Sequence, residues 1–114
     1  MVSREHRFHG LGSLRFVYGR GEVVRGPMFL IKYVRNSKRK TYRVAIVVSK
    51  KVSKSAVVRN RIRRRLYEII REQGMNIREP YDIVVTVHSP EVAEMPSAKL
   101  TTQVIKQLES AKII

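Results

Sequence analysis

The hydrophobic and polar positions along the chain predict strands in three segments. Residues 28–34 alternate with a period of two, as expected of a strand with two distinct faces. Residues 42–48 are rich in β-branched side chains, and residues 81–88 contain a nearly continuous apolar run, which is typical of a buried strand. The polar stretch 36–40 predicts a turn, so that the first two segments would form a hairpin.

Three other segments have the spacing of helices. Residues 14–18 form a short apolar cluster followed by two glycines, which predicts a short helix with a glycine stop. Another helix is expected after Pro96. The longest should begin near Ser53 or Ser55, both good N-caps, and run to about Glu72. Its apolar positions recur in steps that mark a core-facing stripe, made of Val58, Ile62, Leu66, Ile69 and Ile70.

Taken together, these segments predict an α/β (α+β) two-layer sandwich with a small mixed sheet. Two or three strands precede the long helix, which gives the order α-β-β-β-α-β-α when there are three. The unit of strand 42–48, long helix and strand 81–88 implies two roughly parallel strands with the helix crossing between them. General rules would make that crossover right-handed. We expect a single domain over residues 1–114, with residues 1–8 as a flexible tail.

Charge is concentrated in the middle of the chain. The 114 residues carry a net charge of +15, of which residues 1–31 contribute +3, residues 32–71 contribute +14 and residues 72–114 contribute −2. Like charge at this density repels itself, so a folded domain that keeps it usually has a polyanionic partner. RNA or another nucleic acid is the leading candidate. An anionic membrane surface and a basic surface kept only for solubility are the alternatives.

Composition excludes several other classes of protein. The sequence contains no cysteine, so disulfides and thiolate metal sites are ruled out and a cytoplasmic location is expected. No apolar run approaches the roughly 20 residues of a membrane-spanning helix, and residues 1–12 lack the apolar stretch of a signal peptide.

The long helix and the loop before it are the strongest candidate for a binding site. A helix N-terminus offers free N–H groups to phosphate, and arginines add planar groups that match phosphate oxygens. Glu68 is the sole acidic residue among positions 32–71, and it could pair with Arg64 four residues away. The candidate RNA-binding cations are Lys50, Lys51, Lys54, Arg59, Arg61, Arg63, Arg64 and Arg65.

Aromatic residues beside the first strand suggest a second binding mode. Single-stranded RNA is commonly held by bases stacked on aromatic side chains beside a basic rim. Phe29 and Tyr33 would share one strand face, and a short helix carrying Phe16 and Tyr18 could fold back over that face. The alternative is that these rings fill the core, as aromatic residues on strands usually do.

No arrangement of residues indicates a protein-borne active site. His6, His9 and His88 have no partner at metal-ligand spacing, so no metal site is expected. Glu79 and Asp82 flank Pro80 and look like turn residues. Nucleophile-elbow, phosphate-loop and dinucleotide motifs are absent.

One stretch resembles a known protein family. Residues 49–64 read Ser-Lys-Lys-Val-Ser-Lys-Ser-Ala-Val-Val-Arg-Asn-Arg-Ile-Arg-Arg. This closely resembles the signature of the bacterial ribonuclease P protein family, S-K-K/R followed by K-A-V-x-R-N-R-x-K/R-R. Residues 17–29 and 81–85 are more loosely similar, and the likeness covers about residues 7 to 110. The chain departs from the family at Ser13-Leu14, where an acidic–Phe pair is usual, and at Tyr67, where arginine is common.

The resemblance implies a function that composition alone does not show. The chain would be the accessory protein subunit of a ribonucleoprotein endoribonuclease, whose RNA subunit, with Mg²⁺, removes the 5′ leader of precursor tRNA. The basic helix would bind that catalytic RNA, with Asn60 orienting neighbouring groups or contacting phosphate. A cleft between the first helix and the sheet would hold the single-stranded leader, and its residues would be Phe16, Tyr18, Tyr33, Lys32 and Arg43. The resemblance also implies a left-handed crossover, against the general rule.

Two other functions remain open from the residues themselves. A ribosomal or ribosome-associated RNA-binding protein would have the same composition, and only the ordered motif at residues 49–64 argues against it. A stand-alone nuclease would need a carboxylate or histidine constellation, and none is found.

Overall fold

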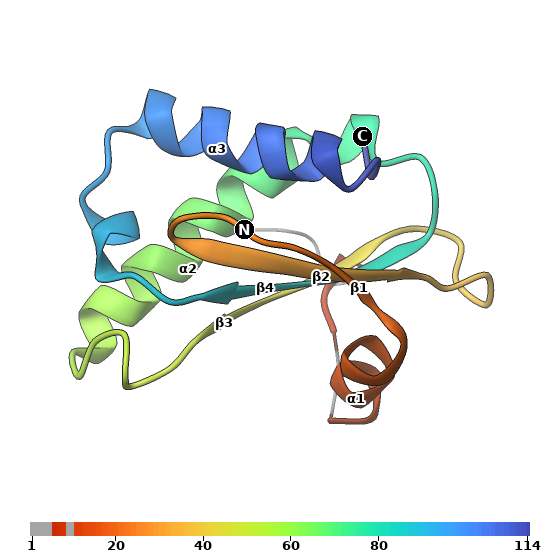
Figure 1. The fold of residues 1–114 in the computed structure, drawn as a ribbon, viewed down its shortest axis with the longest axis horizontal. Helices are drawn as coiled ribbons and strands as arrows, with labels where there is room; N and C mark the ends of the chain where they lie inside the picture. The colour runs from red at the N-terminus through yellow and green to blue at the C-terminus, as the bar shows by residue number, and fades with distance from the viewer. Residues whose placement is uncertain (1–5, 9–10) are drawn as a thin grey trace.

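The described residues form a four-stranded mixed sheet with three α-helices (Figure 1). The structure is a computed structural model that describes residues 6–8 and 11–114, apart from the side chain of Leu11. Two short 3-10 turns, η2 and η3, follow the long helix and the last strand. In chain order, the elements are α1 (Leu11–Arg20), β1 (Glu22–Val24), β2 (Phe29–Arg35), β3 (Arg43–Val48), α2 (Ala56–Glu72), η2 (Gly74–Asn76), β4 (Tyr81–Val87), η3 (Pro90–Ala93) and α3 (Ser97–Ser110).

The strands lie in the order β1-β2-β4-β3. Strand β4 is antiparallel to β2 and parallel to β3, so α2 crosses between two parallel strands as predicted. The predicted hairpin of β2 and β3 is wrong, because β4 inserts between them. The third strand before α2 is β1, a three-residue segment paired with β2. The left hand of the crossover stays a prediction.

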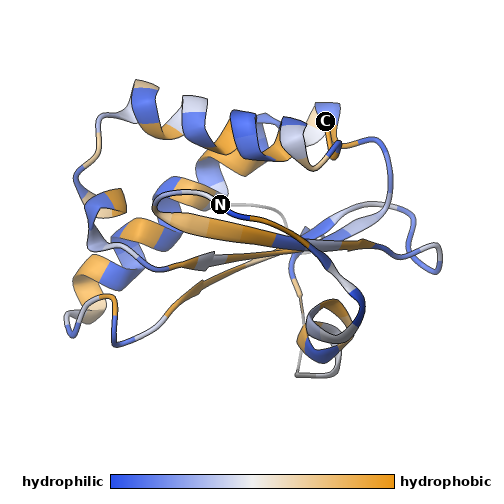
Figure 2. Cartoon of the chain, viewed as in Figure 1, coloured by the Kyte–Doolittle hydropathy of each residue, from blue (hydrophilic) through white to orange (hydrophobic). Residues whose placement is uncertain are grey.

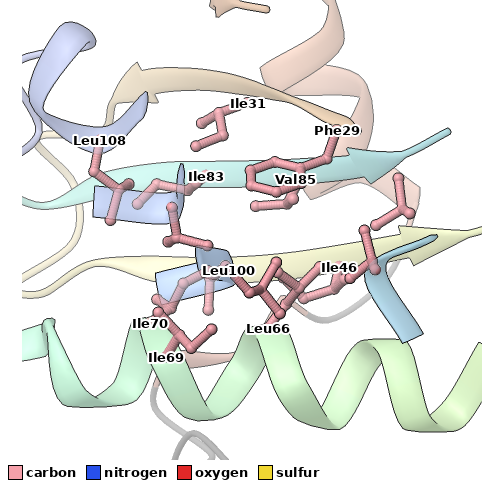
Figure 3. Packing of buried hydrophobic residues seen from close by; sticks show 14 of the residues in the cluster. Phe29, Ile31, Ile46, Leu66, Ile69, Ile70, Ile83, Val85, Leu100 and Leu108 are labelled. Carbon is pink, nitrogen blue, oxygen red and sulfur yellow. The ribbon is translucent and has the colours of Figure 1, made fainter. Parts of the chain in front are cut away.

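The two faces of the sheet are covered by different helices. Helices α2 and α3 turn their apolar sides toward one face, where Ile31, Ile83 and Leu66 lie in the main core (Figures 2 and 3). Sheet and helices there make the predicted two-layer sandwich. Helix α1 lies against the opposite face, where Val17 and Val84 are fully buried (Figure 1). Among the described residues, α1 is the one helix that covers this second face, and Leu30 and Lys32 of β2 stay partly exposed there.

Local sequence explains where α1 and α2 begin and end. The Ser55 hydroxyl accepts a hydrogen bond from the Val58 N–H at 3.3 Å, which caps the first turn of α2. Helix α1 ends at Arg20, and the N–H of the next residue, Gly21, donates to the Val17 carbonyl at 2.7 Å. A Cβ at position 21 would lie 2.5 Å from that carbonyl oxygen, so the close approach requires glycine.

Residues 6–8 pack against the sheet. Arg7 forms a parallel bridge with Val44, and the His6 ring stacks on Tyr42 with 4.0 Å between ring centroids. Residues 6–8 thus have defined contacts with the sheet, and the flexible tail expected over residues 1–8 stays a prediction. Residues 1–5 lie outside the part of the chain that the structure describes.

Candidate RNA-binding surfaces

The loop after β3 and the first half of α2 present cations that no other described part of the protein neutralises. Lys50, Lys51, Lys54 and Arg64 are exposed, and among the described residues none of the four makes an ion pair or a side-chain hydrogen bond. A free, exposed cation can approach a phosphate without first breaking an internal contact. These four residues therefore form the centre of what we call the basic surface.

Other predicted cations of α2 hold parts of the protein together. Arg65 donates to the carbonyl oxygens of Val92, at 2.6 Å, and of Met95, so its guanidinium fastens the η3 segment to α2. Arg59 donates to the Ser53 carbonyl at 2.8 Å and braces the loop before the helix. Arg65 therefore has a structural role, and its predicted phosphate contact stays a prediction.

Two further arginines lie at the border of the basic surface. Arg61 is half-exposed and pairs with the exposed Glu94 at 3.3 Å, a contact that water and salt weaken. Arg63 donates to the Asn60 side-chain oxygen and so orients that amide. Arg61, Arg63 and Asn60 thus stay accessible to RNA alongside the four free cations.

The basic surface fades toward the end of α2. Glu68 pairs with Arg71, three residues on, at 2.5 Å, rather than with Arg64 as the spacing suggested. The hydrogen bond from Arg71 lowers the pKa of the Glu68 carboxyl, which therefore remains negatively charged at neutral pH. Because Glu68 is taken by Arg71, Arg64 keeps its full charge for an external partner.

Two of the residues predicted for the leader cleft, Tyr18 and Lys32, lie together where α1 meets β2. The Lys32 ammonium donates to the Tyr18 carbonyl at 2.8 Å and lies 5.5 Å from the centre of the Tyr18 ring. Tyr18 is 44% exposed, and Phe16, two residues earlier on α1, is partly exposed. An accessible ring beside a cation is the combination that holds single-stranded RNA.

Tyr33 lies on the other face of the sheet, contrary to its predicted place in this cleft. It is paired with Ile83 of the main core, and its hydroxyl donates to Glu22 at 3.0 Å. Its ring meets the edge of Tyr81 with 6.1 Å between centroids. Burial, with the Glu22 contact second, raises the pKa of the Tyr33 phenol. Phe29, on the same face, is fully buried, so no stacking platform forms there.

Arg43 was also predicted at the rim of the cleft, but it is buried. Its guanidinium makes two hydrogen bonds to Asp82, at 2.9 and 2.8 Å, and Asp82 is fully buried in β4. Asp82 also accepts from the Asn36 amide at 2.9 Å. Asp82 is therefore a strand residue in a buried ion pair, and its predicted place in a turn is wrong.

Three cations of the turn predicted at residues 36–40 also reach the surface. Lys38, Arg39 and Lys40 are exposed in the connection from β2 to β3, which we call the basic turn. Asn36 shapes this connection, because its side-chain oxygen accepts from the Lys38 N–H at 3.2 Å and its carbonyl from the Arg39 N–H at 3.0 Å. Three consecutive cations in the sequence could have indicated a binding site here, but the segment was predicted only as a turn.

The described residues contain no group of three histidine, cysteine, aspartate or glutamate side chains placed to hold a metal ion. His6 bonds to the Tyr42 carbonyl at 2.8 Å and His88 is exposed at the end of β4, whereas His9 lies outside the described residues. Within residues 6–8 and 11–114, no helix is long and apolar enough to cross a membrane.

Comparison with known proteins decides between the functions left open. The family model described as Ribonuclease P matches residues 2–112. The chain belongs to the ribonuclease P protein family. A ribonuclease P protein component from a Pseudanabaena species is 35% identical, covering 100% of this chain and 97% of that protein. One from Chloroflexus aurantiacus is 33% identical over 99% of this chain and 82% of its own length.

Solved structures of ribonuclease P proteins have the same fold. The RNase P protein of Staphylococcus aureus matches with a TM-score of 0.84 and 25% identity, covering 95% of this chain and 96% of that one. The protein from Thermotoga maritima matches with a TM-score of 0.76 at 23% identity, covering 85% and 89% of the two chains. The resemblance found at residues 49–64 is thereby confirmed, and nothing in the comparisons favours a ribosomal protein.

Proposed function

We propose that this chain is the protein subunit of ribonuclease P and that it binds RNA through two separate surfaces. The basic surface would bind the catalytic RNA, and the α1 face would bind the single-stranded 5′ leader of precursor tRNA. The observation that carries the proposal is the position of the free cations. All four free cations lie within the family motif of residues 49–64, and they are Lys50, Lys51, Lys54 and Arg64.

The basic surface suits a folded RNA because its charges extend over a loop and two turns of helix. Each phosphate that a lysine or arginine neutralises releases a condensed counterion, and this release drives binding. The N–H groups of the first turn of α2 add a partial positive charge at the same end. Such a surface recognises phosphate positions rather than base sequence.

The α1 face suits a single strand because it offers both stacking and charge. Tyr18 and Phe16 present accessible rings, and Lys32 supplies a cation directly beside the Tyr18 ring. Tyr33 and Arg43 take no part, since one lies on the opposite face and the other is buried against Asp82.

The protein would supply binding and orientation, and catalysis would come from the RNA subunit with Mg²⁺. The test is cleavage of precursor tRNA by the cognate RNA at low Mg²⁺, with and without the chain. We expect the chain to raise the cleavage rate and the affinity for precursor tRNA. Cleavage by the chain with no RNA subunit present would contradict the proposal and revive a stand-alone nuclease.

A variant of Tyr18 tests the leader surface separately. Tyr18→Ala should weaken binding of leader-bearing precursor tRNA to the assembled complex by roughly tenfold, because one stacked base contributes about 1–3 kcal/mol. Binding of mature tRNA, which has no leader, should not change. Tyr33→Phe is the matched control and should leave both affinities as they are. Equal weakening of both substrates by Tyr18→Ala would show that the α1 face does not bind the leader.

A further inference from the structure

The outer side of α2 carries a hollow that simple attraction to phosphate does not explain. It has a volume of about 370 Å³, which is within the range of small-molecule sites. Its lining consists of Val57, Asn60, Arg63, Arg64 and Tyr67. These residues recur at steps of three and four along the helix, so the hollow lies within the basic surface rather than beside it.

The walls of the hollow are apolar. Val57 is 74% exposed, so a branched aliphatic side chain faces water in the middle of a strongly charged surface. Further along α2, the Tyr67 hydroxyl accepts a hydrogen bond from the Ile46 N–H at 3.2 Å. Strand β3 is an edge strand of the four-stranded sheet, and this bond satisfies a backbone N–H that has no partner strand among the described residues. The same bond fixes the Tyr67 ring in place, which reduces the ordering cost of a ligand that packs against it.

Polar groups stand around these walls. Arg63 donates to the Asn60 side-chain oxygen, which holds the amide in one orientation and leaves its NH₂ group to face a ligand. Arg64 has no partner among the described residues, so its charge is available to a phosphate next to the hollow. The hollow therefore combines a fixed aromatic ring, an aliphatic side chain, an oriented amide donor and a free guanidinium.

We propose that this hollow binds one unstacked nucleobase of the RNA that docks on the basic surface. The base would pack against Tyr67 and Val57, the Asn60 amide would donate to an acceptor on its edge, and Arg64 would bind the adjoining phosphate. A phosphate alone would use the arginines but not the apolar walls, so the base is the part of the ligand that the hollow selects. This inference rests on the proposed RNA-binding role of the basic surface and adds a site that reads bases in addition to charge.

Two short RNA chains of equal charge can test the site. The probes are a five-nucleotide oligoadenylate and an abasic ribose-phosphate chain of the same length, each titrated into isotopically labelled full-length protein and followed by NMR. The oligoadenylate should shift the Tyr67 ring and Asn60 amide signals, whereas the abasic chain should leave them in place. The Arg64 and Lys54 signals should respond to both probes, because both carry the same phosphates.

Variants then separate the hollow from the rest of the surface. Tyr67→Ala should raise the dissociation constant for oligoadenylate, read at the Asn60 amide, by roughly tenfold. Val57→Ser should raise it severalfold without endangering the fold, because Val57 is mostly exposed. Neither variant should change the salt dependence, since no charge is removed. Met75→Ser is the control, because Met75 is 91% exposed and lies outside the hollow.

The possible failures are distinguishable. If both probes shift Arg64 and Lys54 but neither shifts Tyr67 and Asn60, the hollow binds no base and the basic surface stands as a phosphate site alone. The same conclusion follows if Val57→Ser binds oligoadenylate as tightly as the unmodified protein. If neither probe shifts Arg64 or Lys54, the proposed role of the basic surface itself is overturned.

Discussion

A buried ion pair between Arg43 and Asp82 joins several parts of the fold. The pair links β3 to β4. Its Asp82 carboxylate also accepts a hydrogen bond from the Asn36 amide in the connection between β2 and β3, and its Arg43 guanidinium donates to the Ser13 hydroxyl of α1 at 3.4 Å. The Phe8 ring lies 4.8 Å from the same guanidinium. Because all these contacts meet at one buried charge, the pair positions α1 over the sheet face that we assign to the leader.

Replacing Asp82 with alanine should destabilise the protein strongly. The change leaves the Arg43 guanidinium buried without a counter-charge, which typically costs about 3–5 kcal/mol. Glu79→Ala is the matched control, because Glu79 pairs with Arg35 at 2.9 Å on the surface, where such pairs contribute about 0–1 kcal/mol. Urea unfolding of both variants measures the difference. Similar midpoints for the two would mean that water reaches Arg43 and that the pair does not hold α1 in place.

The sequence could not reveal this pair, although it identified both residues as polar. Arg43 and Asp82 are 39 residues apart, and only the insertion of β4 beside β3 brings them together. The prediction put Tyr33 on the wrong face of the sheet for a related reason. Alternation along β2 correctly groups Tyr33 with Phe29 and Ile31, but it does not say which of the two faces α1 will cover. Tertiary packing decides which helix covers which face of a sheet, and the local sequence pattern carries no information on that packing.

Helix α2 was the most predictable element, and its structure separates residues that look alike in the sequence. The spacing of apolar positions correctly placed Ile62, Leu66, Ile69 and Ile70 in the core, because a helix buries one stripe whatever it packs against. The arginines between them could not be ranked from spacing. The role of Arg65 depends on residues 92–95, which lie more than 20 residues further along the chain and supply the two carbonyl groups that bind its guanidinium.

Arg64 and Arg65 should therefore respond differently to the same substitution. Arg64→Ala should weaken binding of the catalytic RNA and reduce the slope of log affinity against log salt by roughly one unit or less, with little effect on stability. Arg65→Ala should lower the urea midpoint, because it removes two hydrogen bonds to backbone carbonyls, and should change the salt slope less. Salt titrations and urea unfolding curves give the salt slope and the urea midpoint of each variant. A larger loss of slope in Arg65→Ala would mean that Arg65 leaves η3 when RNA binds.

At the scale of the whole molecule, positive charge collects at both ends of the sheet. The loop before α2 lies at one end, and the basic turn from β2 to β3 lies at the other, as Figure 1 shows. The excess of acidic residues in the last third of the chain comes from residues 72–96, which contain five acidic residues and one basic residue. The order of elements and this uneven charge were both predictable from the sequence. The separation of the charge into two ends was not, because it follows from the direction in which β3 runs.

The basic turn should contribute to RNA binding if the RNA extends along the sheet from one end to the other. Replacing Lys38, Arg39 and Lys40 together with alanine should then reduce the salt slope by up to about two units, because each lost phosphate contact of a single strand accounts for roughly 0.7. The matched control replaces Lys99, Lys106 and Lys112, which remove the same charge from α3 and the residues just after it. Long-range attraction would weaken equally in both variants, whereas direct contact would be lost only in the first.

Precursor tRNA with leaders of increasing length should distinguish which RNA the basic turn contacts. If the basic turn binds the far end of the leader, its loss should matter only for long leaders, and an effect that is independent of leader length would assign the turn to the catalytic RNA instead.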